Sequence, residues 1–184
     1  MEIIKTKIKD LLIIEPKVFG DERGFFVETY NDKRYKTAGI NVNFKQDNLS
    51  KSKKGVLRGL HRQEGIYTQG KLVQVITGAV LDVAVDARLN SLTYGQWESV
   101  TLSGKNKKQF YVPPGFLHGF VTLEDETIFN YKCTELYYPE SELCVKWNDK
   151  TLNIDWQLEK YGIEEVIVSE KDQQGIDFKN LAKK

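Results

Sequence analysis

Residues 71–87, with the sequence KLVQVITGAVLDVAVDA, decide the class of fold. Two runs rich in valine, isoleucine and leucine flank Thr77-Gly78; β-branched residues favour strands and glycine favours a turn. From Leu81 to Asp86 every second residue is leucine or valine, which is the period of a strand with one apolar face. We therefore predict a β-hairpin whose second strand has an apolar face and an opposite face that carries Asp82, Ala84 and Asp86.

The rest of the middle of the chain repeats this pattern. A second hairpin is predicted from strands at residues 120–123 and 127–135, with the acidic turn Glu124-Asp125-Glu126 between them. Further strands are expected at residues 94–102 and 110–112. Many short strands separated by glycine, asparagine or proline predict a mainly all-β fold, an antiparallel sandwich or barrel.

Helical signals are weak and lie towards the ends of the chain. Asn31 is a suitable N-cap for a short helix that runs to Ala38 and ends at Gly39. Residues 153–161 are expected to hold a turn or two. Because no repeat, low-complexity tract or linker divides the 184 residues, we expect one domain, residues 1–184, with short peripheral helices.

Composition bears on partners and compartment. Lysine and arginine total 27 against 26 aspartates and glutamates, so net charge predicts no general affinity for nucleic acid or an anionic membrane. The first residues lack the apolar core of a signal peptide, and no stretch reaches the length of a membrane-spanning helix. We expect a cytoplasmic protein in which Cys133 and Cys144 are reduced thiols, with a disulfide between them as the alternative.

The chain has two histidines, His61 and His118, and the first question is whether they bind a metal. Pro113-x-Gly115-x-x-His118 resembles the second motif of the cupin superfamily, which lies in the mouth of an antiparallel barrel. Metal-binding cupins pair it with an earlier His-x-His motif, but here Arg62 follows His61. A transition-metal site typically has at least three protein ligands, so no metal is predicted, with Glu64 as the one further ligand considered.

The residues before His61 favour a functional role. In Arg58-Gly59-Leu60-His61 a glycine stands between long polar side chains in a predicted strand, which favours a β-bulge or the close approach of a ligand. A bulge would also bring Arg58 and His61 to one face, which regular alternation forbids. His118 alone is equally well explained as a structural histidine after a Pro-Gly turn.

Several segments together resemble one family. They are residues 19–26 (FGDERGFF), 46–48 (QDN), 57–61 (LRGLH), 71–73 (KLV), 113–120 (PPGFLHGF) and 137–142 (YYPESE). In this order they are similar to dTDP-4-dehydrorhamnose 3,5-epimerases, and the resemblance covers roughly residues 3 to 175. It implies a cupin-type jelly-roll barrel and a cofactor-independent isomerase of dTDP-L-rhamnose biosynthesis, a pathway that serves cell-surface polysaccharides.

The substrate that the resemblance implies, dTDP-4-dehydro-6-deoxy-D-glucose, has a ketone at C4 that acidifies the hydrogens on C3 and C5. Inversion needs a base on one face of the sugar, an acid on the other, and a group that stabilises the enolate. By resemblance, His61 is the base and Asp172 orients it, while Asp177 leaves the choice of carboxylate open. By the same resemblance, Lys71 stabilises the enolate and Tyr131 donates the proton.

The resemblance also assigns residues to the rest of the substrate. Arg23 and Arg58 are expected to bind the pyrophosphate through their forked guanidinium groups, and either Tyr137 or Tyr138 is expected to stack on the thymine. The other expected substrate contacts are Phe25, Phe26, Glu28, Gln46, Asn48, His118 and Glu142. Related members are dimers that exchange N-terminal strands, and the strand-like residues 3–14 are compatible with a homodimer.

Two other functions remain open. An enzyme with the same fold and dyad can invert C3 alone, because protonation at C5 depends on the placement of Tyr131 and the site walls. The chain can also be read as a non-catalytic module that binds a nucleotide sugar. The presence of His61, Lys71, Tyr131 and the candidate Asp172 argues against that reading.

Overall fold

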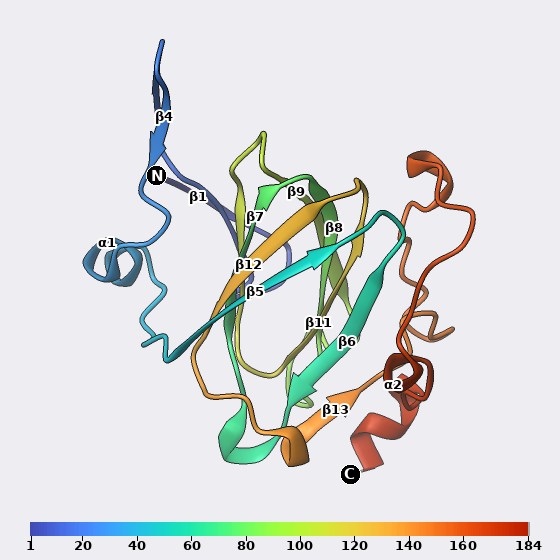
Figure 1. The fold of residues 1–184 in the computed structure, drawn as a ribbon. Coiled ribbons are helices and arrows are strands. Elements are labelled where there is room, and N and C mark those ends of the chain that lie inside the picture. The colour runs from blue at the N-terminus through green and yellow to red at the C-terminus, as the bar shows by residue number, and fades with distance from the viewer. Residues whose placement is uncertain (184) are drawn as a thin grey trace.

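The computed structural model describes residues 1–183, and most of them belong to two antiparallel sheets or to the segments that cover them (Figure 1). The strands are β1 (Glu2–Lys5), β2 (Leu12–Glu15), β3 (Val18–Asp21), β4 (Gly24–Val27), β5 (Gln46–Ser52), β6 (Leu57–Gln63), β7 (Lys71–Thr77), β8 (Ala79–Asp86), β9 (Trp97–Ser103), β10 (Gln109–Val112), β11 (Phe116–Thr122), β12 (Thr127–Cys133) and β13 (Glu142–Cys144). One sheet has the order β1-β2-β10-β7-β12-β5 and the other β13-β6-β11-β8-β9. The predicted antiparallel β-sandwich is confirmed.

Helical structure is limited to short pieces. They are α1 (Asp32–Thr37), α2 (Glu170–Gln173) and the 3₁₀ turns η1 (Gly65–Tyr67), η2 (Pro139–Ser141), η3 (Glu159–Tyr161) and η4 (Phe178–Lys183). Asn31 caps α1 as predicted, because its side chain accepts a hydrogen bond of 3.1 Å from the Arg34 amide. Among residues 1–183, each helix is too short or too polar to cross a membrane.

The pairing of both predicted hairpins is wrong, although their strands are present. β7 pairs with β10 and β12, whereas β8 pairs with β11 and β9 in the other sheet. One residue, Gly78, separates β7 from β8, and this is shorter than the two-residue loop of a tight hairpin. β11 and β12 also lie in different sheets. Both connections are therefore corners at which the chain changes sheet.

The two corners pack against each other. The Thr127 hydroxyl donates a hydrogen bond of 2.7 Å to the Glu124 carbonyl and accepts one of 3.3 Å from the Ala79 amide. Gly78 has φ of +77°, and a Cβ on it would lie 2.9 Å from Cα of Thr127. The corner therefore requires glycine, both for its backbone conformation and for its space.

The alternation predicted in β8 is present, but neither of its faces meets solvent. Leu81, Val83 and Val85 belong to a core cluster that includes Trp156 and Phe178 of the C-terminal segment, which covers the outer side of the five-stranded sheet. The other face points into the sandwich, where Val80 and Ala84 join a second core cluster. Asp82 and Asp86 share this inner face and are fully buried.

The N-terminal region is built differently from the single strand-like segment expected at residues 3–14. It forms two paired strands, β1 and β2, at the edge of the six-stranded sheet. The β3–β4 hairpin follows as a separate two-stranded sheet and projects away from the sandwich (Figure 1). The next segment, through α1, packs Tyr35 and Ile40 on the outer face of the six-stranded sheet.

Replacing Gly78 by alanine should lower the free energy of unfolding by about 2–4 kcal/mol, because strained φ and overpacking of the corner add. Urea denaturation followed by circular dichroism measures this loss. Gly39→Ala is the matched control, since Gly39 has φ of +95° but a Cβ there would meet nothing within 4 Å. The control should lose only about 1–2 kcal/mol; equal losses would contradict the packing role of Gly78.

Candidate active site

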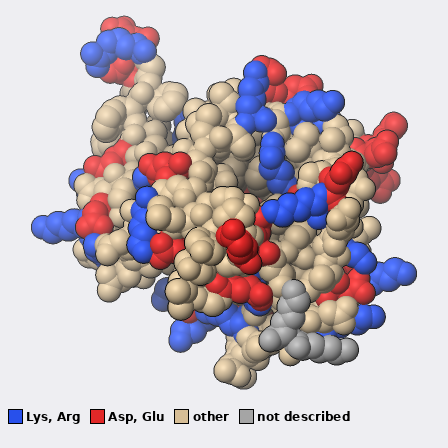
Figure 2. Space-filling view, turned by 60° about the horizontal axis from the view of Figure 1, so that its bottom comes forward, with Lys and Arg blue, Asp and Glu red and all other residues tan. Residues whose placement is uncertain are grey.

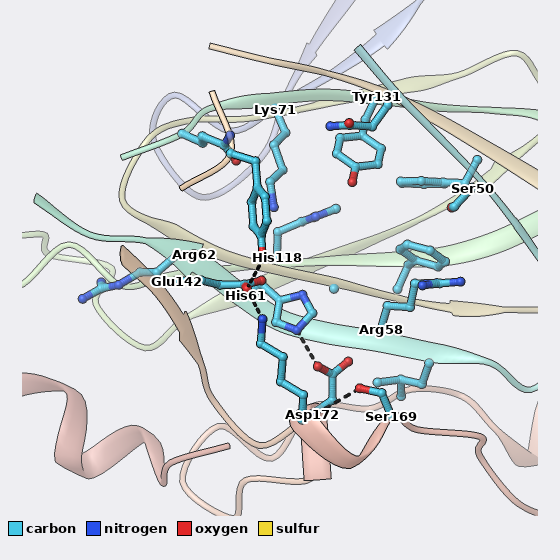
Figure 3. A pocket seen from close by; sticks show the side chains of 18 of the residues that line it. Ser50, Arg58, His61, Arg62, Lys71, His118, Tyr131, Glu142, Ser169 and Asp172 are labelled. Carbon is cyan, nitrogen blue, oxygen red and sulfur yellow. Dashed lines mark hydrogen bonds and ion pairs between the residues drawn. The ribbon is translucent and has the colours of Figure 1, made fainter. Parts of the chain in front are cut away.

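A cavity of about 650 Å³ brings most of the sequence-predicted site residues together (Figure 3). Its walls come from β5, β7 and β12 of one sheet, from β6, β11 and β13 of the other, and from the segment that leads into α2. The predicted residues that line it are Gln46, Asn48, Arg58, His61, Lys71, His118, Tyr131, Tyr137, Glu142 and Asp172.

Other predicted substrate contacts lie outside this cavity within the single chain. Phe25 and Phe26 are on the β3–β4 hairpin and are 59% and 67% exposed. Arg23, at the tip of the hairpin, pairs with Asp21 at 2.6 Å. Glu28, just after the hairpin, pairs with Arg34. The single chain therefore leaves the hairpin residues apart from the site.

The bulge predicted before His61 is present. His118 pairs with His61 and Phe120 pairs with Arg58. Between these pairs β6 has two residues and β11 has one, so β6 contains the extra residue of a bulge. Gly59 has φ of +122°, and a Cβ on it would lie 2.6 Å from Cα of Gly119. The two glycines allow the strands to approach, and Arg58 and His61 both face the cavity.

His61 and Asp172 form a dyad on one wall of the cavity. Nε2 of His61 lies 2.6 Å from Oδ1 of Asp172, and the two side chains are 24% and 5% exposed. The second oxygen of Asp172 accepts a hydrogen bond of 3.1 Å from the Gly59 amide. Burial opposes ionisation of Asp172, but the hydrogen bond and charge of His61 hold its pKa below the ordinary value.

The dyad fixes the form of the imidazole. An ionised Asp172 accepts a hydrogen bond from Nε2–H, which in the neutral imidazole leaves the lone pair on Nδ1. Asp177, the alternative carboxylate, instead pairs with Lys146 at 2.9 Å. The Ser169 side chain caps α2 by accepting a hydrogen bond of 3.1 Å from the Asp172 amide, which fixes the start of the helix.

His118 has a carboxylate partner that the sequence analysis missed. Nε2 of His118 lies 2.9 Å from Oδ1 of Asp82, and both side chains are buried. Burial raises the pKa of Asp82, although the charge and hydrogen bond of His118 oppose the change. The sequence signal that could have revealed this pair is Asp82 itself, because β8 is apolar apart from Asp82 and Asp86 and a buried carboxyl group needs a partner.

Lys71 and Tyr131 extend into the cavity from β7 and β12, across from His61 (Figure 3). Burial lowers the pKa of the Lys71 ammonium, and the negative charges of Glu142 and Asp82 partly offset this. Within residues 1–183 no carboxylate lies in ion-pair contact with Lys71. Burial raises the pKa of Tyr131, so its hydroxyl keeps its proton at neutral pH.

Glu142 is held by two neighbours beside the dyad. Its Oε2 accepts a hydrogen bond of 2.9 Å from the Tyr137 hydroxyl and pairs with Lys171. Burial would raise the pKa of Glu142, but Lys171 and Tyr137 hold it below the ordinary value. Lys171, which the sequence analysis did not assign, is adjacent to Asp172 in the chain.

The structure distinguishes the two candidate tyrosines of residues 137–142. Tyr137 lines the cavity, whereas the ring of Tyr138 stacks on that of Tyr67 at 3.9 Å with an interplanar angle of 3°. The Tyr138 amide also donates a hydrogen bond of 2.7 Å to the Gln63 side chain. Of the two rings, that of Tyr137 is available to a ligand in the cavity.

Local charge makes the cavity suited to an anion. Basic and acidic side chains lie interspersed over the face drawn in Figure 2. The cations that line the cavity include Arg58, Lys71 and Lys171. Arg58 donates a hydrogen bond of 3.3 Å to Ser52 and keeps further donors for a ligand. Arg58 and Lys71 therefore offer donors to an anionic ligand in the cavity.

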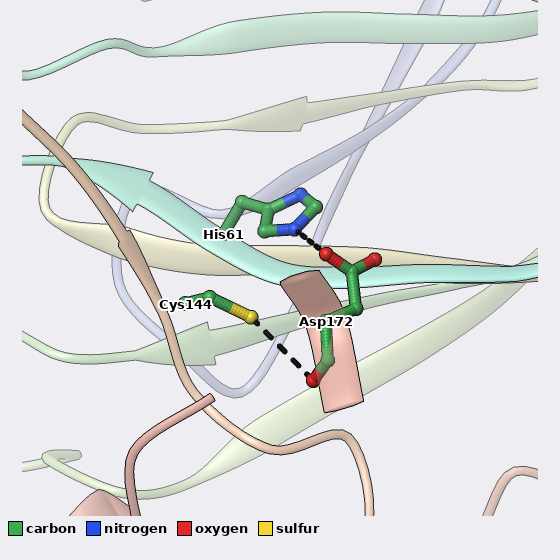
Figure 4. Close-up of side chains that lie close together, drawn as sticks. All are labelled: His61, Cys144 and Asp172. Atoms are coloured by element: carbon green, nitrogen blue, oxygen red, sulfur yellow. Dashed lines mark hydrogen bonds and ion pairs between the residues drawn. The ribbon is translucent and has the colours of Figure 1, made fainter. Parts of the chain in front are cut away.

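A thiol lies beside the dyad (Figure 4). Cys144, His61 and Asp172 each offer one ligand atom, and the three atoms lie within 4.8 Å of one another. Burial, together with the charges of Asp172 and Glu142, raises the pKa of the Cys144 thiol to about 12. The thiol is therefore protonated at neutral pH. In this state the side chains that share a hydrogen-bonded proton are those of His61 and Asp172. Cys144 and Cys133 are both free thiols, as predicted.

Further residues that line the cavity were not assigned from the sequence, although Leu57, Gly119 and Phe120 among them lie in segments that carry the resemblance. They are Ser50, Val56, Leu57, Arg62, Gln63, Gln69, Gly119, Phe120, Phe129, Ile167, Val168, Ser169 and Lys171. Phe120 and Phe129 stack with ring centroids 4.2 Å apart and form an apolar part of the wall.

The chain is similar to proteins of one kind throughout its length. It is 52% identical to the dTDP-4-dehydrorhamnose 3,5-epimerase of Methanothermobacter thermautotrophicus over 170 residues, which are 92% of this chain and 90% of that protein. The dTDP-6-deoxy-D-glucose-3,5-epimerase of Legionella pneumophila, solved in complex with dTDP-4-keto-L-rhamnose, superposes with a TM-score of 0.92. It is 53% identical, and the alignment covers 97% of this chain and 93% of that one.

A more distant structure shares the fold. It is a 3'-monoepimerase from Streptomyces bikiniensis in complex with dTDP-quinovose, with a TM-score of 0.88 and 29% identity over 97% of this chain and 88% of that one. The family model described as dTDP-4-dehydrorhamnose 3,5-epimerase matches residues 5–180. The cupin-type sandwich, the dyad in its cavity and this match together show that the chain belongs to the dTDP-4-dehydrorhamnose 3,5-epimerase family.

Proposed function

We propose that this chain inverts both C3 and C5 of dTDP-4-dehydro-6-deoxy-D-glucose, without a cofactor, and so forms dTDP-4-dehydro-L-rhamnose. Family membership makes the chain an isomerase of dTDP-rhamnose biosynthesis. One observation carries the proposal. The His61–Asp172 pair, with 2.6 Å between Nε2 and Oδ1, faces a cavity into which Lys71 and Tyr131 project from the opposite sheet.

His61 is the base in this proposal. Its Nδ1 lone pair takes a proton from the carbon next to the C4 ketone, and the electron pair of the broken C–H bond moves into an enolate. Asp172 keeps the ring proton on Nε2 and stabilises the imidazolium that forms. The Gly59 amide holds the other carboxylate oxygen, so the orientation of the dyad is fixed before the substrate binds.

Lys71 stabilises the negative charge on O4 of the enolate. Its half-buried side chain lines the cavity without a carboxylate partner among residues 1–183, so the ammonium is free to donate to a substrate oxygen. A donor held in such a site is worth on the order of 10²–10³ in rate. Burial also makes the ammonium more acidic, which favours hydrogen bonding to a developing oxyanion.

Tyr131 returns the proton to the opposite face. Its phenol stays protonated because burial raises its pKa, and its O–H bond breaks as the new C–H bond forms. His61 loses its proton to solvent and the tyrosinate regains one, so each inversion leaves the enzyme unchanged. Repeating the cycle at the second carbon completes the reaction.

The nucleotide half is assigned to the mouth of the cavity. In this proposal Arg58 binds the pyrophosphate, Tyr137 stacks on the thymine, and Glu142 accepts a hydrogen bond from the base. Gln46, Asn48 and His118 bind the substrate as well. The contacts that hold Glu142 and Tyr137 support this assignment. Side chains that are already ordered lose less conformational entropy when a ligand binds than mobile side chains do.

The proposed assembly is a homodimer, in which each β3–β4 hairpin supplies the partner's site with Arg23, Phe25 and Phe26, and Glu28 follows directly after the hairpin. The support is the hairpin's exposure and its separation from the sandwich in the single chain (Figure 1). Exposed aromatic rings of this kind commonly mark an interface. We place the protein in the cytoplasm, a compartment that its free thiols support.

Inversion of C3 alone is the second candidate function. It is favoured by one observation, the shared fold of a 3'-monoepimerase. The chain is more similar to enzymes that carry the 3,5-epimerase name, and this supports the double inversion as the first choice. Proton NMR in heavy water with the 4-keto sugar nucleotide, coupled to the following reductase, separates the two activities.

The variant His61→Asn should lose solvent-deuterium incorporation at both carbons by about 10²–10⁴-fold, because no base remains to remove the carbon-bound proton. Proton NMR measures the exchange, and calorimetry with dTDP checks that the folded protein still binds nucleotide. Asp172→Asn should also slow exchange strongly, whereas its matched control Asp177→Asn should not. Near wild-type exchange in His61→Asn would remove this residue from the base role.

The variant Tyr131→Phe should still exchange deuterium but give little or altered epimer, since abstraction survives while delivery to the opposite face is lost. Exchange and product configuration are both read from the same NMR spectra. Tyr138→Phe, whose ring stacks on Tyr67, is the control and should retain both activities. Parallel loss of exchange and dTDP binding in Tyr131→Phe would instead identify a structural tyrosine.

The proposed dimer predicts complementation between two impaired variants. Arg23→Ala lacks the hairpin contact and His61→Asn lacks the base, so a mixed dimer contains one complete site and one doubly defective site. Co-expressed chains should recover about one quarter of wild-type activity, since about half of the dimers are mixed. Activity that stays at the sum of the separate variants would mean that the hairpin does not serve a partner.

A further inference from the structure

The thiol of Cys144 beside the dyad adds a sulfur atom that can bind a metal ion. Cys144 is the last residue of β13 and lies directly opposite His61 in the antiparallel ladder with β6. Nitrogen, sulfur and carboxylate oxygen are the donors that bind Zn²⁺, at about 2.0–2.3 Å. Tetrahedral bonds of that length place the donor atoms roughly 3.3–3.8 Å apart. Here the three atoms lie within 4.8 Å of one another, so a shift of about 1 Å suffices.

We propose that His61, Cys144 and Asp172 form an inhibitory site for thiophilic divalent cations such as Zn²⁺ and Cd²⁺. The cation replaces the proton that His61 and Asp172 share. The inhibition, but not the binding, rests on the role of His61 proposed above.

The surroundings favour entry and retention of such a cation. His61 is 24% exposed towards the cavity, so a hydrated ion can reach it. The Gly59 amide holds Oδ2 of Asp172, which leaves Oδ1 to bind the metal. The carboxylate of Asp172 supplies negative charge directly beside Nε2 of His61, and Lys171, its neighbour in the chain, is paired with Glu142. These contacts provide the outer-shell support that metal ligands usually need.

The proton balance explains why binding would inhibit. The cation displaces the thiol proton of Cys144 to solvent and forms a metal–sulfur bond. The lone pair of Nε2 then binds the metal, and the ring proton moves from Nε2 to Nδ1 of His61. Asp172 remains ionised, so one proton is released for each cation bound. Nδ1 now carries hydrogen and can no longer remove a proton from carbon.

Inhibition by Zn²⁺, Cd²⁺ and Mg²⁺ of enzyme pretreated with EDTA and desalted tests the proposal. Zn²⁺ and Cd²⁺ should inhibit the wild type, and EDTA should restore activity, whereas Mg²⁺ should have no effect because it prefers oxygen ligands. Cys144→Ala should keep its basal activity and require at least about tenfold more Zn²⁺ for half-inhibition. The other thiol provides the control Cys133→Ala, which should remain as sensitive as the wild type. Equal sensitivity of Cys144→Ala would overturn the proposal.

Cobalt absorption gives a readout that does not depend on catalysis. Co²⁺ should produce a thiolate-to-metal charge-transfer band in the wild type and in Cys133→Ala, but not in Cys144→Ala or Cys144→Ser. The serine variant keeps the test valid if the alanine variant fails to fold. Absence of the band from the wild type would overturn the site. A normal band on a protein without epimerase activity would uphold the site and reject only the proposed function.

Discussion

The carboxylate of Asp172 is the contact on which the site depends. One oxygen binds Nε2 of His61 and the other binds the Gly59 amide, so a single group fixes both the base and the bulge beneath it. Its residue comes from the C-terminal segment, 111 positions from His61 in the chain. The base is therefore oriented only when this segment has packed on the five-stranded sheet.

Like Asp172, the two buried carboxyl groups on the inner face of β8 each contact a basic side chain. Asp82 meets His118 at the cavity, and Asp86 pairs with Arg88 at 2.8 Å at the end of the strand. Burial opposes ionisation of Asp86, but hydrogen bonds from Arg88, Ser91 and Thr93 lower its pKa to about 2. One strand therefore carries two carboxyl groups into the interior, because each has an immediate partner.

The sequence predicts much of this molecule because strand periodicity and glycine placement are local properties. The strands, the bulge at Gly59 and the expectation that His61 is functional needed only neighbouring residues, whereas its role as the base came from the family resemblance. The sheet changes at Gly78 were not predictable in this way, since alternation identifies the face of a strand but not its partner. The same holds for Asp82, whose partner is 36 residues away, and for Tyr138, which is withdrawn from the cavity by its stack on Tyr67.

The sandwich places the His61–Asp172 dyad and the groups opposite it on different sheets. His61 belongs to β6 in the five-stranded sheet, whereas Tyr131 and Lys71 belong to β12 and β7 in the six-stranded sheet. Facing sheets lie about 10 Å apart, which leaves room for one sugar ring between the proposed base, His61, and the proposed acid, Tyr131. The ring centroid of Phe129 lies 5.8 Å from that of Tyr131, and Phe129 also stacks on Phe120, so ring packing helps to hold Tyr131 in place. In the proposed mechanism, opposed proton transfer thus follows from the layers of the fold, and the choice of carbon depends on how the sugar lies between them.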